Sequence, residues 1–267
     1  MQDEEQPGVF RLQLPAAPRV PVLFESPHSG RLYPPDFASC QPEAALRPAE
    51  DAFVDELLAM APSHGIPVMA ALFPRAYVDP NRALDDLDPA LLAEPWPEPV
   101  APGPKSALGI GLVRRVVTPE VPIYDRRLTV AEVRRRIDAY WRPYRARLDA
   151  LIAALARQHG QLLIVQWHSM KAEGNAATPD GPGARRADVV LGDRHGRTAA
   201  PAVVDRLAGL FAAEGLTVAR NAPYAGTPIL QHMTTLAPGV QAIQVELNRR
   251  LYLDEATTER HAVTASL

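Results

Sequence analysis

The chain has 267 residues, of which 47% are hydrophobic and 22% are charged, and its formal net charge is −3. This length fits one large α/β domain with a substantial core better than two ordinary domains. The charge provides no bulk basic field for nucleic acid or an anionic membrane, and the single cysteine excludes a disulfide framework and a multi-cysteine zinc site.

The N-terminal residues resemble a loose leader. We therefore expect a flexible leader at 1–19 and a single catalytic domain at 20–267. The segment from Met1 to Gly8 is acidic and polar, without the basic start and apolar stretch of a signal peptide. The sequence contains no run of about 18 apolar residues that would predict a transmembrane helix. These features predict a cytoplasmic protein without a membrane partner.

The first half of the domain alternates short apolar runs with polar turns. An apolar run at 20–24 ends at Glu25-Ser-Pro-His-Ser-Gly30, which predicts a buried strand followed by a loop. Apolar residues at helical spacing predict an amphipathic helix over 51–61. Further strands are expected at 67–73 and 76–78. The Pro-rich segment 85–122 has no clear period, and long loops of this kind are usually functional or mobile.

The second half begins with a long helix predicted over 129–158. Thr129 and Glu132 fit a capping box at its start, and Gly160 fits a stop after its end. The remaining patterns predict strands at 162–165, 187–191, 217–220 and 241–247, and helices at 199–213 and 256–263. Strands that alternate with helices predict an α/β fold with a mixed, mostly parallel sheet between layers of helices.

Polar residues follow several of these predicted strands. His28, His168 and Glu246 each lie at or just after an apolar run, as do residues 79–82. The carboxyl ends of the strands form the ligand site in sheets of this type, so these side chains are expected to converge. Taken alone, either histidine could equally be a hydrogen-bonded core or loop residue.

Two histidines and a carboxylate form a zinc ligand set with an open position, which is typical of catalytic sites. Zinc activates water and polarises a carbonyl, and a separate carboxylate must then move the proton. Glu246 suits that role, because a carboxylate at the end of a buried strand is costly unless it is paired or functional. The alternative is a buried salt bridge to an arginine such as Arg249.

Two arginines and an asparagine flank the predicted strand at 76–78. Arg75, Asn81 and Arg82 lie within Pro74-Arg-Ala-Tyr-Val-Asp-Pro-Asn-Arg82. Guanidinium groups match carboxylates in a bidentate way, so this cluster predicts an anchor for an acidic substrate. The alternative is a solvated turn with an Asp79–Arg82 pair.

Seven segments, in order along residues 20–255, resemble the N-formylglutamate amidohydrolase family. They are Pro27-His-Ser-Gly30, Glu50-Asp-Ala-Phe-Val-Asp-Glu-Leu57, Pro74-Arg-Ala-Tyr-Val-Asp-Pro-Asn-Arg82, Trp167-His-Ser-Met170, Leu191-Gly-Asp193, Asn221-Ala-Pro-Tyr-Ala-Gly226 and Gln244-Val-Glu-Leu-Asn-Arg-Arg-Leu-Tyr252. That family is similar to the zinc carboxypeptidases and aspartoacylases. The resemblance implies their three-layer fold, with a mixed sheet of about eight strands.

The resemblance also implies roles for individual residues. It implies one Zn²⁺ per chain, held by His28, Asp51 and His168, with Glu246 as general base and acid. The pair Asn81-Arg82 resembles the asparagine and arginine that grip the substrate carboxylate in these relatives. Arg75 and Tyr224 resemble further residues of the substrate pocket.

The chain departs from the family pattern at three places. Gln166 stands where the family usually has aspartate in Asp-x-His-Ser, and Arg145 stands where histidine is expected in Pro-Tyr-His. Thr227 interrupts the usual double glycine after Pro-Tyr. The first change affects support of a metal histidine, and the third affects the substrate loop.

These features together predict a zinc-dependent hydrolase that cleaves the N-acyl amide of an acidic amino acid. The predicted substrate is N-formyl-L-glutamate, which gives L-glutamate and formate and would place the enzyme in histidine breakdown. One alternative is a metallo-carboxypeptidase or amidase for another acylated amino acid or peptide. Another is a metal-free binding protein for acidic metabolites. No nucleic acid partner is expected, and no oligomeric state is predicted.

Overall fold

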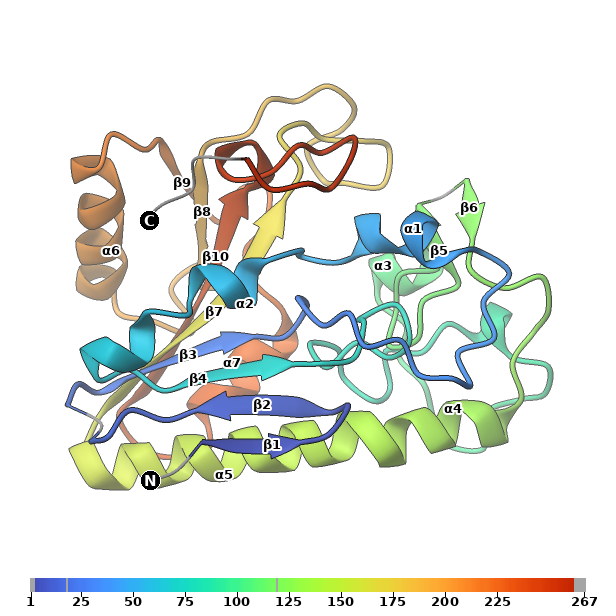
Figure 1. The fold of residues 1–267 in the computed structure, drawn as a ribbon, viewed down its shortest axis with the longest axis horizontal. Coiled ribbons are helices and arrows are strands. Elements are labelled where there is room, and N and C mark those ends of the chain that lie inside the picture. The colour runs from blue at the N-terminus through green and yellow to red at the C-terminus, as the bar shows by residue number, and fades with distance from the viewer. Residues whose placement is uncertain (1–2, 18, 119, 262–267) are drawn as a thin grey trace.

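The computed structural model describes residues 3–17, 19–118 and 120–261. Its centre is an eight-stranded sheet with the strand order β1-β2-β4-β3-β7-β10-β8-β9 (Figure 1). The strands are β1 Glu4–Gln6, β2 Phe10–Gln13, β3 Val22–Ser26, β4 Val68–Ala71, β7 Leu162–Met170, β8 Val189–Gly192, β9 Val218–Arg220 and β10 Val240–Asn248. A separate two-stranded sheet pairs β5 Val116–Thr118 with β6 Val121–Pro122.

The four central strands run parallel to one another. β4, β3, β7 and β10 pair in parallel, whereas β2 is antiparallel to β4 and β8 is antiparallel to β10. The prediction of a mixed, mostly parallel sheet of about eight strands is therefore confirmed. The carboxyl ends of β3, β7 and β10 lie next to one another at one edge of the sheet.

Helices cover both faces of the sheet. The helices are α1 Glu43–Leu46, α2 Val54–Leu57, α3 Pro104–Ala107, α4 Val130–Arg136, α5 Arg142–His159, α6 Pro201–Ala213 and α7 Pro228–Thr234. Residues from α5 and α7 share one core cluster with Leu23, Ile164 and Ala242 of the central strands. Val54 of α2 and Val204 of α6 pack with the alternate strand residues, such as Val165, in a second cluster. The period-two alternation of each strand thus builds a three-layer molecule.

The long helix predicted over 129–158 is present with one irregularity. Its capping box is formed by Thr129 and Glu132, and it ends at Gly160 in a left-handed conformation with φ 72°. A π-helical turn over Ile137–Trp141 joins α4 to α5. In Figure 1, α5 runs along the side of the sheet formed by β1 and β2. Over the described residues, no helix is long and apolar enough to cross a membrane.

The prediction of a flexible leader at 1–19 is wrong for most of that segment. β1 and β2 form one edge of the main sheet, and β2 pairs with β4 from Phe10 to Gln13. Phe10 and Leu12 are buried while Arg11 between them is exposed. Strands of three and four residues are too short for this alternation to stand out in a sequence.

Three other predicted elements also differ from the structure. The helix expected over 51–61 contains only the single turn of α2, because Phe53 adopts φ 65° immediately before it. Residues 76–78 form a turn, in which the Tyr77 amide donates to the Pro74 carbonyl. At 256–261 the chain makes turns capped by the Asp254 carboxylate, so no helix begins there. The remainder of that prediction, 262–263, lies outside the described residues.

Candidate active site and metal centre

Three neighbouring strands deliver the polar residues of the site. His28 follows β3, His168 lies near the end of β7, and Glu246 lies near the end of β10. Glu246 is paired directly with His168 in the β10–β7 register. A Cβ atom on Gly30 would lie 2.2 Å from the Phe73 carbonyl oxygen, so only glycine lets the loop after His28 approach β4 so closely.

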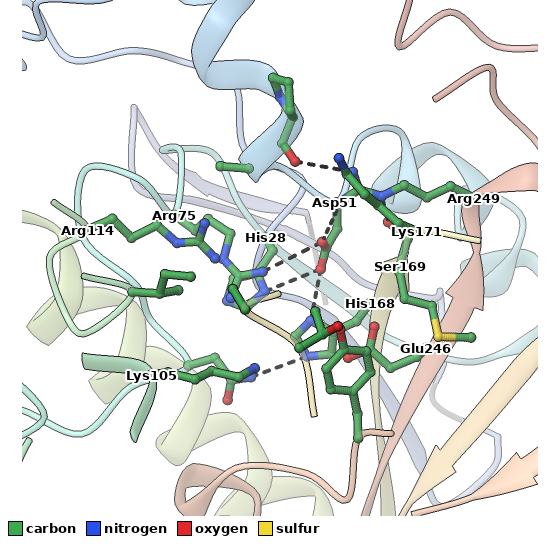
Figure 2. Close-up of a pocket in the computed structure, with 18 of the residues that line it drawn as sticks. His28, Asp51, Arg75, Lys105, Arg114, His168, Ser169, Lys171, Glu246 and Arg249 are labelled. Atoms are coloured by element: carbon green, nitrogen blue, oxygen red, sulfur yellow. Dashed lines mark hydrogen bonds and ion pairs between the residues drawn. The ribbon is translucent and has the colours of Figure 1, made fainter. Parts of the chain in front are cut away.

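Asp51 brings the two histidines together. Its Oδ2 atom lies 3.3 Å from His28 Nδ1 and 3.0 Å from His168 Nδ1, and the imidazole centroids are 4.6 Å apart (Figure 2). All three residues are buried, with at most 2% of each exposed. The structure thus joins three residues that are widely separated in sequence into one cluster whose donor atoms could hold a metal ion.

The donor geometry fits a metal ion. Ligands at about 2.1 Å from a tetrahedral zinc lie roughly 3.4 Å from one another, close to the separations around Asp51. His28 Nε2 lies 2.7 Å from Asp79 Oδ1. Because an ionised carboxylate only accepts hydrogen bonds, a neutral His28 carries its proton on Nε2 and turns the lone pair of Nδ1 toward Asp51. A lone pair that faces a carboxylate oxygen is an arrangement that suits a cation.

Two arginines complete the surroundings of the acidic residues. Arg75 donates to Asp79 Oδ2 at 3.0 Å, and Arg249 donates to Asp51 Oδ1 at 3.3 Å. Burial acts to raise the pKa of Asp51, but the contacts with His168 and His28 and the charge of Arg75 outweigh it and hold the pKa well below its usual value. Burial is likewise outweighed at Asp79, whose pKa is held low by the neighbouring His28 and Arg75. Both carboxylates are therefore ionised.

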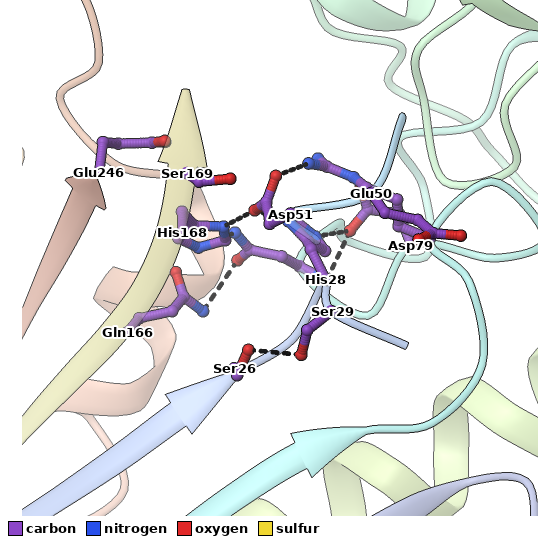
Figure 3. Close-up of polar contacts among 12 residues, drawn as sticks. Ser26, His28, Ser29, Glu50, Asp51, Asp79, Gln166, His168, Ser169 and Glu246 are labelled. Atoms are coloured by element: carbon purple, nitrogen blue, oxygen red, sulfur yellow. Dashed lines mark hydrogen bonds and ion pairs between the residues drawn. The ribbon is translucent and has the colours of Figure 1, made fainter. Parts of the chain in front are cut away.

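A buried chain of hydrogen bonds lies behind His168 (Figure 3). Asn81 Nδ2 lies 3.3 Å from His168 Nε2, and Asn81 Oδ1 accepts from Gln166 Nε2 at 3.2 Å and Thr227 Oγ1 at 2.8 Å. Gln166 also donates to Glu25 Oε2 at 2.9 Å. Arg145 Nη1 lies 4.0 Å from Glu25. The three departures from the family pattern, at Gln166, Thr227 and Arg145, therefore surround the same chain.

Glu246 faces the same pocket. Its Oε1 atom accepts a hydrogen bond from Gln244 Nε2 at 2.8 Å, and only 8% of the residue is exposed. Burial raises the pKa of its carboxyl group, which suits a residue that takes up and releases a proton. Within the described part of the chain, Glu246 has no arginine partner, because Arg249 pairs with Asp51 instead.

The predicted substrate-binding residues all line the pocket, together with the metal cluster and Glu246. They are Arg75, Asn81, Arg82 and Tyr224. Arg82 donates to Asp86 Oδ2 at 3.2 Å, which replaces the Asp79–Arg82 pair considered from the sequence. Burial raises the pKa of Tyr224 to about 12, so its hydroxyl remains a hydrogen-bond donor.

Several pocket residues were not predicted from the sequence. The sequence suggests Arg249 only as a salt-bridge partner and Gln244 only as part of a motif. Lys105 and Arg114 come from the segment 85–122, which carries no periodic signal. The one sequence feature that suggests a functional role for this segment is its length, since long loops in compact domains are often functional.

Several known proteins that this chain resembles carry the name N-formylglutamate amidohydrolase or deformylase. The sequence model of the N-formylglutamate amidohydrolase family matches residues 20–253. An N-formylglutamate deformylase of Pseudomonas aeruginosa is 30% identical over 89% of this chain and 84% of its own, and one of Pseudomonas putida is 27% identical over 89% and 83%. The crystal structure of an N-formylglutamate amidohydrolase from Ralstonia eutropha is 42% identical and superposes with a TM-score of 0.88. That match covers 96% of this chain and 91% of the other.

Proposed function

Because the chain belongs to the N-formylglutamate amidohydrolase family and is an amidohydrolase, we propose that it is a zinc-dependent enzyme that hydrolyses N-formyl-L-glutamate to L-glutamate and formate. The observation that carries this proposal is the cluster of His28, Asp51 and His168 beside Glu246 in a pocket lined with cations. As the resemblance implies, this reaction would belong to histidine breakdown in the cytoplasm.

One zinc ion per chain would be held by His28, Asp51 and His168. Two imidazoles and one carboxylate leave a coordination position open, which distinguishes a catalytic zinc site from a structural one. When bound, zinc supplies Lewis acidity that activates water and polarises the formyl carbonyl. Asp79 orients His28 through Nε2, so the plane of that ring is fixed independently of the ion.

Glu246 is the general base and then the general acid. It accepts a proton as the water oxygen forms its bond to the formyl carbon. It then donates that proton to the nitrogen as the carbon–nitrogen bond breaks, and L-glutamate leaves as the amine. Burial of the carboxyl group raises its pKa, which brings proton uptake and release closer to neutral pH.

The substrate is oriented by residues from the turn after β4. Arg82 and Asn81 hold the α-carboxylate, and Arg75, which Asp79 fixes beside the zinc ligands, stabilises negative charge on the carbonyl oxygen. Tyr224, which also lines the pocket, contributes a hydroxyl group. Asp86 holds the Arg82 guanidinium in place, so little side-chain freedom is lost when substrate binds.

A substrate panel tests the proposal. The purified protein, loaded with one equivalent of zinc, is assayed with the N-formyl, N-acetyl and N-succinyl derivatives of L-glutamate and with N-formylated neutral amino acids. We expect formate release from N-formyl-L-glutamate to have the highest kcat/KM. Faster cleavage of another acyl group would identify a different amidase. Tight binding of acidic metabolites without turnover or zinc would identify a binding protein.

A further inference from the structure

The pocket is strongly cationic although the whole chain is not. Seven lysine or arginine residues line it, against the two carboxylates of Asp51 and Glu246. The cations are Arg75, Arg82, Lys105, Arg114, Lys171, Arg186 and Arg249. A pocket with this imbalance attracts anionic ligands.

Most of the arginines already have carboxylate partners within the protein. The ion pairs are Arg75 with Asp79 at 3.0 Å, Arg82 with Asp86 at 3.2 Å, Arg186 with Asp180 at 2.7 Å and Arg249 with Asp51 at 3.3 Å. These pairs fix the guanidinium groups and neutralise part of their charge. The remaining cations are therefore the best candidates for binding an additional anionic group.

Arg114 and Lys105 have no carboxylate partner among the described residues. Arg114 is 7% exposed, and its buried Nε atom has no hydrogen-bond partner. Burial and the neighbouring Arg75 lower the pKa of Arg114 to about 9. Lys105 is half-buried with its ammonium 5.1 Å from the Tyr224 ring centroid, and burial and Arg82 lower its pKa to about 8. A buried guanidinium without a carboxylate partner is costly, so Arg114, with Lys105 nearby in the pocket lining, favours an anionic ligand.

The segment that carries both residues is fastened to the substrate anchor. Asp86 Oδ2 accepts from Arg82, and Asp86 Oδ1 accepts from the Gly103 amide at 2.8 Å, directly before α3, which contains Lys105. The Asp79 amide donates to the Leu112 carbonyl at 2.7 Å, two residues before Arg114. The separation between Arg82 and the two unpaired cations is thus set by the fold.

We propose that Lys105 and Arg114 form a second carboxylate subsite, which recognises the side-chain carboxylate of a dicarboxylic N-acyl amino acid. This inference rests on the proposed function, in which Arg82 and Asn81 hold the α-carboxylate. A substrate with two carboxylates needs two cationic contacts, and an ammonium and a guanidinium each donate charge-assisted hydrogen bonds to a carboxylate. The Pro-rich segment 85–122 thereby acquires a role in substrate selection.

Lys171 is the competing candidate for this role. It also lines the pocket, but Figure 2 places it with Arg249 on the other side of Asp51 from Arg114. Lys105 and Arg114 instead lie on the side of Arg75 (Figure 2). The subsite is therefore assigned to the pair on the segment 85–122.

Kinetics with two substrates of similar size test the assignment. The zinc-loaded parent, Lys105→Met and Arg114→Gln are compared on N-formyl-L-glutamate and N-formyl-L-glutamine. Each substitution should lower kcat/KM for the glutamate substrate about tenfold or more, since a charge-assisted hydrogen bond is lost. The value for the glutamine substrate should change little. Lys105→Arg should keep the preference, and Arg206→Gln, at an exposed site on α6, should behave as the parent.

Ligand binding to proteins that carry Glu246→Gln, which removes the general base, tests the subsite independently of the proposed function. Calorimetry with the same two ligands should show a preference for the glutamate ligand that Lys105→Met or Arg114→Gln removes. If the parent hydrolyses neither compound but this pattern of binding holds, the function is wrong and the subsite stands. An equal loss for both ligands, an unaltered preference, or a preference removed only by Lys171→Met would overturn the subsite.

Discussion

Asp51 organises the site by using its two oxygen atoms differently. Oδ2 faces both imidazoles, whereas Oδ1 faces Arg249 and lies 3.7 Å from Arg75. The contacts with His168 and His28 and the charge of Arg75 overcome the effect of burial and keep the pKa of Asp51 low. The carboxylate is therefore ionised throughout the pH range in which an imidazole is neutral, and both conditions are needed for metal binding.

Glu246→Gln should separate chemistry from metal binding. The substitution keeps the shape of the side chain and its place beside His168 but removes its ability to accept a proton. We expect the variant to retain one zinc per chain and to lose about 10²–10⁴-fold in kcat. Metal analysis and formate release, measured on the same preparation, would provide both values.

Glu214→Gln is a matched control for that substitution, because Glu214 is exposed after α6. It should leave both zinc content and kcat unchanged. A Glu246→Gln enzyme that works at the parent rate would remove Glu246 from the mechanism. Loss of zinc together with activity would instead make it part of the metal site.

The residues predicted from the sequence share one property. His28, His168 and Glu246 follow apolar runs, so the run that predicts the strand also places the polar residue at or after its end. Asp51, by contrast, follows a short 3₁₀ turn and was predicted only from the family resemblance. Lys105 and Arg114 could not be predicted, because their segment has no periodic pattern and its place beside Asp79 and Asp86 depends on tertiary hydrogen bonds.

At the scale of elements, β7 and β10 act as one unit. Gln166 is paired with Gln244 and His168 with Glu246 in the parallel register. Alternate residues of a strand share a face, so both strands present polar pairs on the same side of the sheet near their carboxyl ends. Gln166 donates to Asn81, and Asn81 in turn contacts His168.

Gln166→Glu should destabilise the fold in a pH-dependent manner. It places a carboxylate against Glu25, and both positions are completely buried. One of the two must hold a proton, so the pKa of the new carboxyl group is raised in the folded state. Such a group stabilises the protein at low pH and loses that contribution as pH rises through the folded pKa. We expect a loss of about 3 kcal/mol at about pH 8 and a smaller loss at about pH 5.

Chemical denaturation at both pH values would measure this difference. Gln161→Glu provides the same change in charge at an exposed position immediately before β7. It should cost less than about 0.5 kcal/mol at either pH. If Gln166→Glu unfolded at the same denaturant concentration as this control, the chain of hydrogen bonds behind His168 would contribute nothing measurable.

Element length explains which parts of the fold were predicted. The helix at 129–158 and the strand β10 are long enough for their patterns to be clear, and their predicted positions agree with the structure, whereas the strand predicted at 162–165 covers only the first part of β7. The strands β1 and β2 and the turn at 76–78 involve at most four residues each. At that length tertiary contacts, rather than local pattern, decide the conformation.

For the molecule as a whole, charge is distributed unevenly. The net charge of −3 gives no indication of an anion site, yet the cations that line the pocket outnumber its carboxylates. The sheet produces this separation because loops from distant parts of the chain meet at one edge. Bulk charge consequently predicts solubility and non-specific binding, whereas substrate choice depends on local charge.

The metal cluster also connects distant parts of the fold, so zinc should stabilise the whole domain. His28 follows β3, Asp51 precedes α2 and His168 belongs to β7. An ion bound to all three favours the folded state by about 4 kcal/mol when its free concentration is about 1,000 times Kd. For a chain of this size, that corresponds to an increase in Tm of roughly 10 °C. Thermal unfolding with zinc and with a chelator should show this shift in the parent and in His64→Ala, an exposed control.

His168→Ala should abolish this increase in Tm, because the two remaining ligands bind zinc too weakly. Equal shifts in the parent and His168→Ala would mean that zinc binds elsewhere.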